Sequence, residues 1–363
     1  MSLFSILGPD ATRVARIVTV VLCAVLAGGN VLAQSTSPTE NNALVSERPA
    51  ADSRPTPVTV AVYFFDIDEI NDVRQQFSVD MFFRVTWQDP RLALPADQRA
   101  GQLRVIPRDH VWRPKGLIIN DRGLNLQLPQ VVEVDDMGNV RYRQRVTGNL
   151  SFESELSRFP FDVQYLPVDF VSYAYAPDEL LWSRESVVIG SVTTLATEGW
   201  SFTLLKPEFG ELTIPEEGIS RPRMTFLIEA QRESQYYLLT MFLPMSLIIF
   251  MAWTVFWLQP DIVSSRIAIS TASIFSLIAF GFSLRLSLPR VSYLTIADVF
   301  VIGCTLMVFL ALGVAVIGSR MASAGHMDGA VRLNGIARWG YLLLFSLIVG
   351  SVAVLQAGGP LTN

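Results

Sequence analysis

The sequence contains very little cysteine or histidine. Of 363 residues, two are cysteine and two are histidine. Cys23 and Cys304 both lie in apolar segments, so neither can staple the polar part of the chain with a disulfide. His110 and His326 do not combine with acidic residues at metal-ligand spacing, and we find no glycine-rich phosphate loop or nucleophile elbow. The sequence therefore predicts no cofactor, no metal site and no enzyme activity.

Charged residues are also scarce. They make up 17% of the chain, whereas 50% is hydrophobic, a composition that predicts membrane segments. Residues 35–235 carry 29 acidic and 20 basic residues, and the rest of the chain carries 4 and 8. This acidic middle region, with few basic residues elsewhere, argues against nucleic acid as a partner.

The N-terminus has the pattern of a signal peptide. Arg13 and Arg16 precede the apolar run Ile17–Leu26. The following Val31-Leu32-Ala33 has the small-residue pattern of a cleavage site after Ala33. We expect residues 1–33 to be removed. The alternative is an uncleaved anchor, but the apolar run is short for a span. Residues 34–56 are rich in Ser, Thr, Pro and Asn, which predicts a disordered lead-in.

Residues 57–235 alternate between apolar and polar side chains over short runs. Val58–Phe65, Phe77–Trp87, Val140–Val146 and Phe161–Val171 are examples, and Pro, Gly and Asp separate them. Period-two alternation is typical of half-buried antiparallel strands. About ten such runs predict an all-β, immunoglobulin-like sandwich placed outside the cytoplasm.

Residues 236–363 form the predicted transmembrane domain, a four-helix bundle. Each span approaches the length that crosses a hydrocarbon core of about 30 Å at 1.5 Å per residue. The predicted spans are residues 237–258, 264–288, 293–317 and 338–357. Between the last two, Arg320, Arg332 and Arg338 outnumber Asp328, which predicts a cytoplasmic link.

The second span differs from the others in its hydroxyl and small residues. At helical spacing they fall on one stripe with two phenylalanines. The stripe is Ser264, Ala268, Ala272, Phe275, Ala279, Phe282 and Leu286. One interpretation is a tightly packed helix interface. The other is a pore-lining helix, in which a ring of Phe275 closes the pore by dewetting.

Several short motifs occur in a fixed order along the chain. They are Trp87-Gln88-Asp89-Pro90-Arg91-Leu92, Trp112 with Pro114 and Asn120, Phe159-Pro160-Phe161-Asp162, Tyr236–Pro244, and Pro289. On these motifs, ahead of four spans, residues 58–358 resemble the pentameric ligand-gated ion channels, also called the Cys-loop receptor superfamily. Animal members bracket the Phe-Pro-Phe-Asp loop, here called the signature loop, with a disulfide. Phe152 and Leu166 stand at those positions, and the prokaryotic branch also lacks that disulfide.

The resemblance implies a homopentamer, in which this chain and four identical subunits surround a path for monovalent ions. It also implies a bacterial inner membrane location with the outer domain in the periplasm. Gating would pass through the signature loop residues Phe159, Pro160, Phe161 and Asp162, and through Arg232 and Pro289. We expect Asp162 and Arg232 to form a partly buried bridge, the alternative being two solvated charges.

The resemblance places the agonist between neighbouring outer domains. By position, Phe82, Tyr173, Tyr175 and Phe209 would line this ligand-binding pocket, and the alternative is that they belong to the sandwich core. An aromatic cage near Glu211, Glu216 or Glu217 would suit a cationic amine. Protons are the rival trigger, with His110 as the ready sensor of the outer domain.

Ion selectivity stays open between cations, anions and little discrimination. Ser264, Ser265 and Arg266 stand at the inner mouth, after Asp261, and the linker from Trp257 has the length found in anion-conducting relatives. The net negative outer domain favours cations instead. A non-conducting, membrane-anchored periplasmic ligand sensor is the alternative function.

Overall fold

The computed structural model describes residues 47–49, 54–183, 197–215, 218–287 and 291–357. The predicted signal peptide and most of the lead-in lie outside these residues, as do Glu216, Glu217 and Pro289. The chain divides into a unit of residues 1–47 and a unit of residues 48–363. The β-sheets and the long apolar helices all belong to the second unit.

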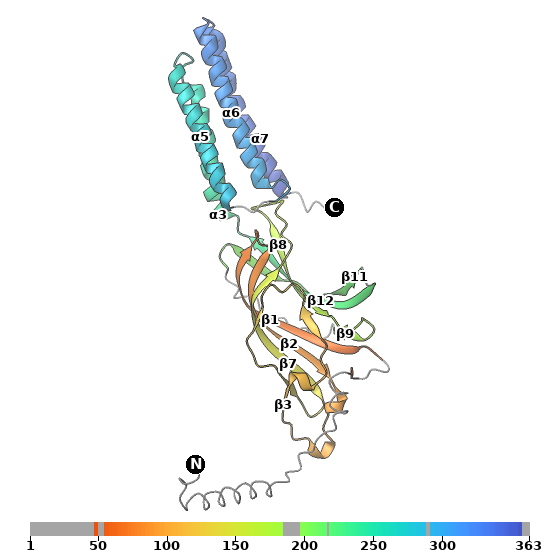
Figure 1. The fold of residues 1–363 in the computed structure, drawn as a ribbon. Coiled ribbons are helices and arrows are strands. Elements are labelled where there is room, and N and C mark those ends of the chain that lie inside the picture. The colour runs from red at the N-terminus through yellow and green to blue at the C-terminus, as the bar shows by residue number, and fades with distance from the viewer. Residues whose placement is uncertain (1–46, 50–53, 184–196, 216–217, 288–290, 358–363) are drawn as a thin grey trace, which may run out of the picture. The chain divides into compact units, whose positions relative to one another are not determined.

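Two β-sheets make up the polar half of this unit (Figure 1). The seven-stranded sheet contains, in spatial order, β3 (Arg104–Pro107), β6 (Val131–Val134), β7 (Asn139–Ser151), β2 (Gln76–Gln88), β1 (Thr56–Asn71) and β9 (Leu180–Trp182), with β5 (Asn125–Leu126) on β7. The five-stranded sheet contains β10 (Trp200–Leu204), β12 (Ile219–Arg232), β8 (Val163–Ser172) and β4 (Gly116–Ile118), with β11 (Glu208–Ile214) on β12. All pairs are antiparallel except β1 with β9. Three short 3₁₀ helices cover Pro90–Leu92, Ala96–Gln98 and Arg108–His110.

Strand alternation explains why the two sheets share one core. Along β2, every second side chain from Phe77 to Trp87 is buried and the intervening ones face outward. Phe83 of β2 meets Phe170 of β8 edge to face, with ring centroids 5.5 Å apart. Because successive strand side chains point to opposite faces, the apolar set of each sheet turns toward the other. This is the predicted sandwich.

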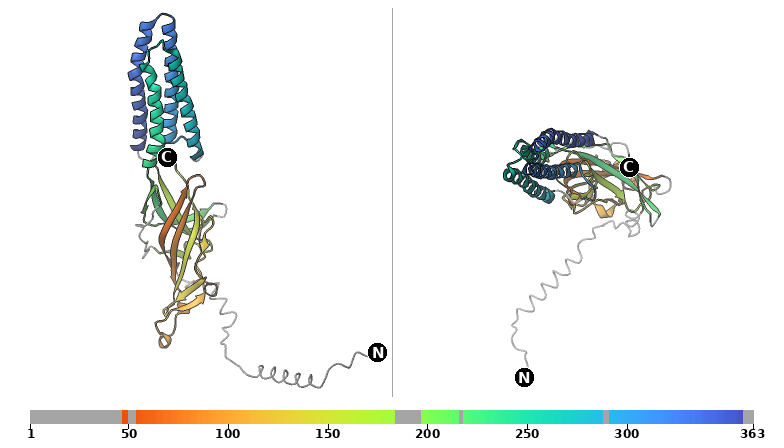
Figure 2. Two further views of the ribbon diagram at one scale, coloured as in Figure 1. Left: turned by 90° about the vertical axis from the view of Figure 1, so that its left-hand side faces the viewer. Right: turned by 90° about the horizontal axis from the view of Figure 1, so that it is seen from above.

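Among the described residues, four helical segments are long and apolar enough to cross a membrane (Figure 2). The first, Gln235–Trp257, is composite: α3 (Gln235–Tyr237), a π-helical turn (Leu238–Phe242), α4 (Leu243–Trp253) and a 3₁₀ turn (Thr254–Trp257). Pro244 has no N–H to donate, so a change of helical hydrogen bonding just before it is expected. The others are α5 (Val263–Ser287), α6 (Ile296–Ser323) and α7 (Met327–Ala357).

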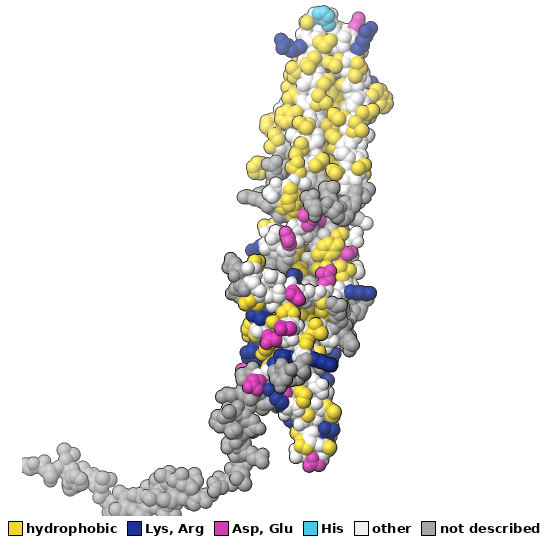
Figure 3. All heavy atoms as spheres, turned by 90° about the vertical axis from the view of Figure 1, so that its right-hand side faces the viewer, with side chains coloured by type: hydrophobic (Ala, Val, Ile, Leu, Met, Phe, Trp, Pro, Cys, Tyr) yellow, Lys and Arg dark blue, Asp and Glu magenta, His cyan; other side chains and the backbone are white. Residues whose placement is uncertain are grey.

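Helices α6 and α7 extend beyond the spans predicted from hydropathy. Only residues 324–326 separate them, so most of the expected cytoplasmic link is helical. Gly325 has a φ of 82°, the left-handed conformation that glycine adopts most readily and that ends a helix. Figure 3 shows apolar side chains along the helices and charged ones gathered at this end. Hydropathy marks the lipid-facing length of a helix but not its polar continuation.

Candidate ligand, coupling and pore sites

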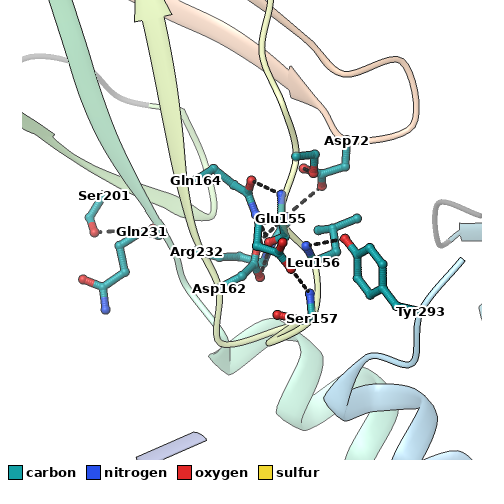
Figure 4. Close-up of polar contacts among 11 residues, drawn as sticks. Asp72, Glu155, Leu156, Ser157, Asp162, Gln164, Ser201, Gln231, Arg232 and Tyr293 are labelled. Carbon is teal, nitrogen blue, oxygen red and sulfur yellow. Dashed lines mark hydrogen bonds and ion pairs between the residues drawn. The ribbon is translucent and has the colours of Figure 1, made fainter. Parts of the chain in front are cut away.

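Arg232, at the end of β12, lies between two carboxylates (Figure 4). Its Nε donates to Asp162 Oδ1 at 2.8 Å and its Nη2 to Asp162 Oδ2 at 3.1 Å. Nη2 also donates to Asp72 Oδ2 at 2.8 Å. Arg232 and Asp162 are both buried, so the bridge expected from the sequence is present and is shielded from water. The sequence did not identify Asp72, which lies in the turn between β1 and β2.

Aromatic rings surround the same guanidinium. Its central carbon lies 4.1 Å from the ring centroid of Trp200, 5.1 Å from that of Phe159 and 5.9 Å from that of Tyr237. The faces of aromatic rings attract cations, most strongly where water is excluded. The guanidinium of Arg232 is therefore in contact with a strand, with the signature loop and with the first membrane helix.

Burial and neighbouring charges shift the pKa values of Arg232 and Asp72 in opposite directions. Burial lowers the pKa of Arg232, but its hydrogen bonds to Asp162 and the charges of Asp162 and Asp72 outweigh this and raise the pKa above its ordinary value. Burial raises the pKa of Asp72, and the nearby Arg232 offsets only part of that rise. The folded protein therefore holds the proton of Asp72 more tightly than an exposed aspartate would.

Gln164 fixes the signature loop around Asp162. Its Nε2 donates to Asp162 Oδ2 at 2.6 Å and to the Glu155 carbonyl at 2.7 Å, while its Oε1 accepts from the Glu155 N–H at 3.1 Å. Gln164 is almost fully buried. In the sequence, Gln164 is recognisable only as a polar residue in the largely apolar strand β8. That pattern does not indicate that it bonds to Asp162 and Glu155.

The signature loop is joined to α6 through backbone groups. The N–H groups of Ile296 and Ala297 donate to the carbonyls of Ser157 and Phe159 at 3.1 and 3.2 Å. The N–H of Leu156 donates to the Tyr293 hydroxyl at 2.9 Å. The amides of Ile296 and Ala297 belong to the first turn of α6, whose own helical hydrogen bonds cannot satisfy them. The signature loop is therefore connected directly to the start of this helix.

The aromatic residues of the signature loop pack against the first membrane helix. The ring centroid of Phe159 is 4.8 Å from that of Tyr237, and that of Phe161 is 6.2 Å from that of Phe242. The peptide bond between Phe159 and Pro160 is cis. Packing, rather than a covalent tie, holds this loop.

The predicted stripe of α5 faces away from the other helices of its own subunit. Phe275 is 67% and Phe282 68% exposed, and Ser264, Ala268, Ala272 and Ala279 are exposed as well. The opposite face, with Ser270, Ser273 and Leu277, is buried. The side chain of Leu286 lies outside the described residues. The stripe is therefore not sealed inside a single bundle.

Arg266 does not belong to this stripe. It is 0% exposed, and its Nη2 donates to Asn334 Oδ1 of α7 at 2.7 Å. Two residues along a helix differ in direction by about 200°, so Arg266 points away from Ser264 and Ala268. In this subunit its guanidinium lies behind α5 and not on the stripe.

The four predicted pocket residues occupy two faces of the sandwich. Phe82 lies on the outer face of β2, opposite Tyr63 on β1 and Arg145 on β7. Tyr173 follows β8 and is 53% exposed, and Phe209 of β11 packs partly against the core. Phe82 belongs to the seven-stranded sheet, whereas Tyr173 and Phe209 lie on or next to the other.

Tyr175 is tied to the buried core of the sandwich. Trp112 is fully buried, and its Nε1 donates to the Tyr175 hydroxyl at 2.7 Å. Burial raises the pKa of Tyr175, and the hydrogen bond from Trp112 offsets part of that rise. We therefore separate Tyr173, which is accessible, from Tyr175, which is tied to the core.

Arginines share the outer face of the seven-stranded sheet with Phe82. Arg84 of β2 is opposite Arg143 of β7. Arg143 pairs with Glu133, and Arg145 pairs with Asp80 at 2.6 Å. Among the described residues, no carboxylate pairs with Arg84. The alternation of arginine along residues 141–145 was the sequence signal for this face.

The hairpin of β11 and β12 is clamped at its root. Arg223 donates from Nε and Nη2 to Asp169 Oδ1 at 3.0 and 2.9 Å, and the Thr225 hydroxyl donates to the same oxygen at 2.5 Å. Asp169 is on β8, four residues before Tyr173. These bonds connect the hairpin to the strand that leads to Tyr173.

A cavity of about 360 Å³ opens between the two sheets on the side of β4. Arg108, Arg113 and Tyr142 line it, together with Tyr173. Arg108 donates from Nη1 to the Tyr142 hydroxyl at 3.1 Å. One exposed tyrosine therefore borders both this cavity and the predicted ligand surface.

Two family models match the chain, one for each half. Residues 42–200 match the neurotransmitter-gated ion-channel ligand binding domain, and residues 241–326 match the neurotransmitter-gated ion-channel transmembrane region. The chain belongs to the neurotransmitter-gated ion-channel family. This confirms the predicted family, the β-rich extracellular domain followed by four apolar helices, and the expectation that the chain is not an enzyme. Members of this family form pentamers.

Curated relatives have low but extended identity. The β-4 subunit of the γ-aminobutyric acid receptor from Gallus gallus is 25% identical over 279 residues, covering 73% of this chain and 55% of the relative. The γ-3 subunit from Homo sapiens is 28% identical over 276 residues, covering 73% and 58%. The chain thus spans somewhat over half the length of these relatives.

Proposed function

We propose that the chain is a subunit of a homopentameric ligand-gated ion channel whose pore is lined by α5. The observation that supports this best is the exposed stripe of α5. In a membrane helix, serine and small residues that face outward serve either a neighbouring helix or water. Phe275 and Phe282 on the same stripe would form hydrophobic rings in a five-fold assembly. Such rings close a pore by dewetting when they narrow.

The agonist would bind between the outer domains of adjacent subunits. One subunit would present Phe82 with Arg84, and its neighbour Tyr173 with the β11–β12 hairpin, where Glu208 and Glu211 are exposed. Aromatic rings and acids suit a cationic amine. Arg84, which has no carboxylate partner among the described residues, suits an anionic group. The relatives are named as receptors for γ-aminobutyric acid, which carries both groups. We therefore favour a small zwitterionic amine over a simple amine, with protons as the rival trigger.

Binding would reach the pore through three linked contacts. The hairpin is clamped to β8 by Arg223 and Asp169. Strand β12 continues from Arg223 to Arg232, which holds the signature loop through Asp162. The loop in turn contacts Tyr293, between α5 and α6, and the first turn of α6. Displacement of β12 would therefore be passed on to the segment that follows the pore helix.

Current measurements in oocytes test this function. Surface-expressed protein is exposed to a panel of amines and amino acids and then to acid, and Phe275→Ala is compared with wild type. We expect an agonist-gated current in wild type, and a leak or shifted gating in Phe275→Ala. Leu343→Ala, on the outer face of α7, is the matched control and should behave as wild type. Reversal potentials in diluted NaCl then give the selectivity.

Silence of both wild type and Phe275→Ala, with normal surface expression, would contradict the channel and favour the membrane-anchored sensor. The turn of residues 324–326 leaves the sensor little chain for cytoplasmic signalling. The channel therefore remains the better supported proposal.

A further inference from the structure

Arg266 is a buried cation with few partners. Its side chain is fully shielded, and only Nη2 donates a hydrogen bond, to Asn334 Oδ1 at 2.7 Å. Nε and Nη1 have no partner among the described residues. The described residues contain no ion pair to Arg266 either. Among them, the side-chain amide of Asn334 is therefore the one hydrogen-bond partner of this guanidinium.

Asn334 joins three segments at this point. It accepts from Arg266 of α5, and its Nδ2 donates to the carbonyl of Leu258, just after the first span, at 3.2 Å. Helix α6 approaches with Gly318, where an added Cβ would lie 3.3 Å from Arg266 Nη1. We call Arg266, Asn334, Gly318 and the Leu258 carbonyl the inner node.

The energetics make Asn334 decisive for the position of Arg266. A guanidinium remains charged in proteins, so it cannot avoid burial by losing its proton. A buried charge that loses its partner is strongly destabilised and moves toward water if it can. Without the Asn334 oxygen, Arg266 would have to leave its place against Gly318 and turn the inner end of α5 with it.

We propose that Asn334 is a positioning residue for the inner mouth of the pore, acting through Arg266. Ser264, the first residue of the stripe, is only two residues from Arg266. A rotation of this end of α5 therefore changes the exposure of Ser264 directly. The proposal rests on the pore role of α5, and it gives α7 control over α5 at a defined contact.

Helix α7 also contacts the first span through Arg338. A variant at Arg338 therefore shows whether any weakening of α7 attachment gives the same result as a change at Asn334. The guanidinium of Arg338, on α7, lies 3.8 Å from the ring centroid of Trp257 and donates from Nη2 to the Phe256 carbonyl at 3.2 Å. The Arg338 carbonyl accepts from Trp253 Nε1 at 2.9 Å. These contacts fix α7 to the first span and involve no residue of α5. Arg338→Met is therefore the matched control.

The test measures labelling of Ser264→Cys by a membrane-impermeant maleimide on inverted vesicles, followed by mass spectrometry. Cys304 is fully buried, and the protein with Ser264 intact gives the background. Arg266 and Ser264 point to nearly opposite sides of α5, so turning Arg266 toward water turns Ser264 away from it. We therefore expect Asn334→Leu to lower the labelling rate at least threefold. Asn334→Asp keeps the oxygen that accepts from Arg266 and loses only the Nδ2 donor to the Leu258 carbonyl. Its labelling rate should stay within twofold of the parent, as should that of Arg338→Met.

The double variant guards against a simple folding defect. If Asn334 acts through Arg266, then Asn334→Leu adds nothing to the labelling rate once Arg266→Met is present. An unchanged or raised rate in Asn334→Leu, an equal fall in Arg338→Met, or a further fall when Asn334→Leu is added to Arg266→Met would each overturn the proposal. Labelling requires no current, so this outcome is read independently of whether the wild type conducts.

Discussion

Arg232 and Asp162 form a two-point bridge in which both side chains are almost fully withdrawn from water. The residues are 70 positions apart and come from the last strand and the signature loop. Removing one partner of such a pair leaves a buried charge uncompensated, which typically costs about 3–5 kcal/mol. A single substitution in this bridge is therefore expected to destabilise the outer domain strongly.

Asp162→Asn tests that sensitivity. We expect the free energy of unfolding to fall by about 3 kcal/mol or more, because Arg232 would keep only Asp72 as an acidic partner. Thermal or denaturant unfolding of the purified protein measures it. Asp109→Asn removes the exposed partner of Arg113 and should change stability by no more than about 0.5 kcal/mol. Equal effects of the two substitutions would contradict the burial argument.

Asp72 should make stability depend on pH. Its pKa is raised by burial above the ordinary value of 3.8, so the folded protein holds this proton more tightly than the unfolded chain does. The resulting stabilisation is complete below that ordinary value and is lost as the pH rises through the raised one. Wild type should therefore gain stability relative to Asp72→Asn as the pH is lowered from neutral to about 4. Melting curves across that range measure the difference, and a constant offset would be the contrary result.

Tyr173 and Tyr175 should separate binding from stability. Tyr175→Phe leaves Trp112 Nε1 buried without its acceptor, which should cost about 1–3 kcal/mol of folding stability. Tyr173→Phe should alter stability by less than about 0.5 kcal/mol, since this side chain is exposed. Tyr173→Ala should instead raise the agonist concentration for half-maximal current. A larger loss of stability in Tyr173→Phe than in Tyr175→Phe would reverse the assignment.

Arg84→Gln should weaken an agonist that carries an anionic group. A hydrogen bond to a charged group contributes about 1.5–3 kcal/mol, so we expect affinity to fall by roughly tenfold or more. Dose–response curves for an amino acid and for the matching amine without the acid measure this. The amine should lose little. Arg99→Gln, which alters a loop arginine bonded to the Leu94 carbonyl, serves as the control. Equal losses for both ligands would point to a structural role of Arg84.

Local patterns were sufficient for much of the fold. Alternation along Phe77–Trp87 predicted a strand with one buried face, and helical spacing from Ser264 to Phe282 predicted a stripe on a single face of α5. Both are properties of neighbouring residues, so the sequence carries them directly. The bridge of Asp162 to Arg232 was expected only because the motifs resemble a known family.

Contacts between distant segments were missed for a physical reason. Asp72 meets Arg232 only after the turn between β1 and β2 folds against the signature loop, and Asn334 meets Arg266 only after α5 and α7 pack. Asp is common in turns, so Asp72 does not stand out among its neighbours. Asn334 lies inside α7, and nothing next to it in the sequence points to Arg266. The buried role of each comes from packing that no short pattern encodes.

The turn at residues 324–326 is also a suitable site for inserting a fluorescent label. Two long helices flank it, and its residues are exposed on the side assigned to the cytoplasm. Exposed turns accept inserted domains better than other positions do. A fluorescent protein placed after Gly325 would mark each subunit without touching the pore stripe, and stepwise photobleaching of single complexes would count how many copies assemble.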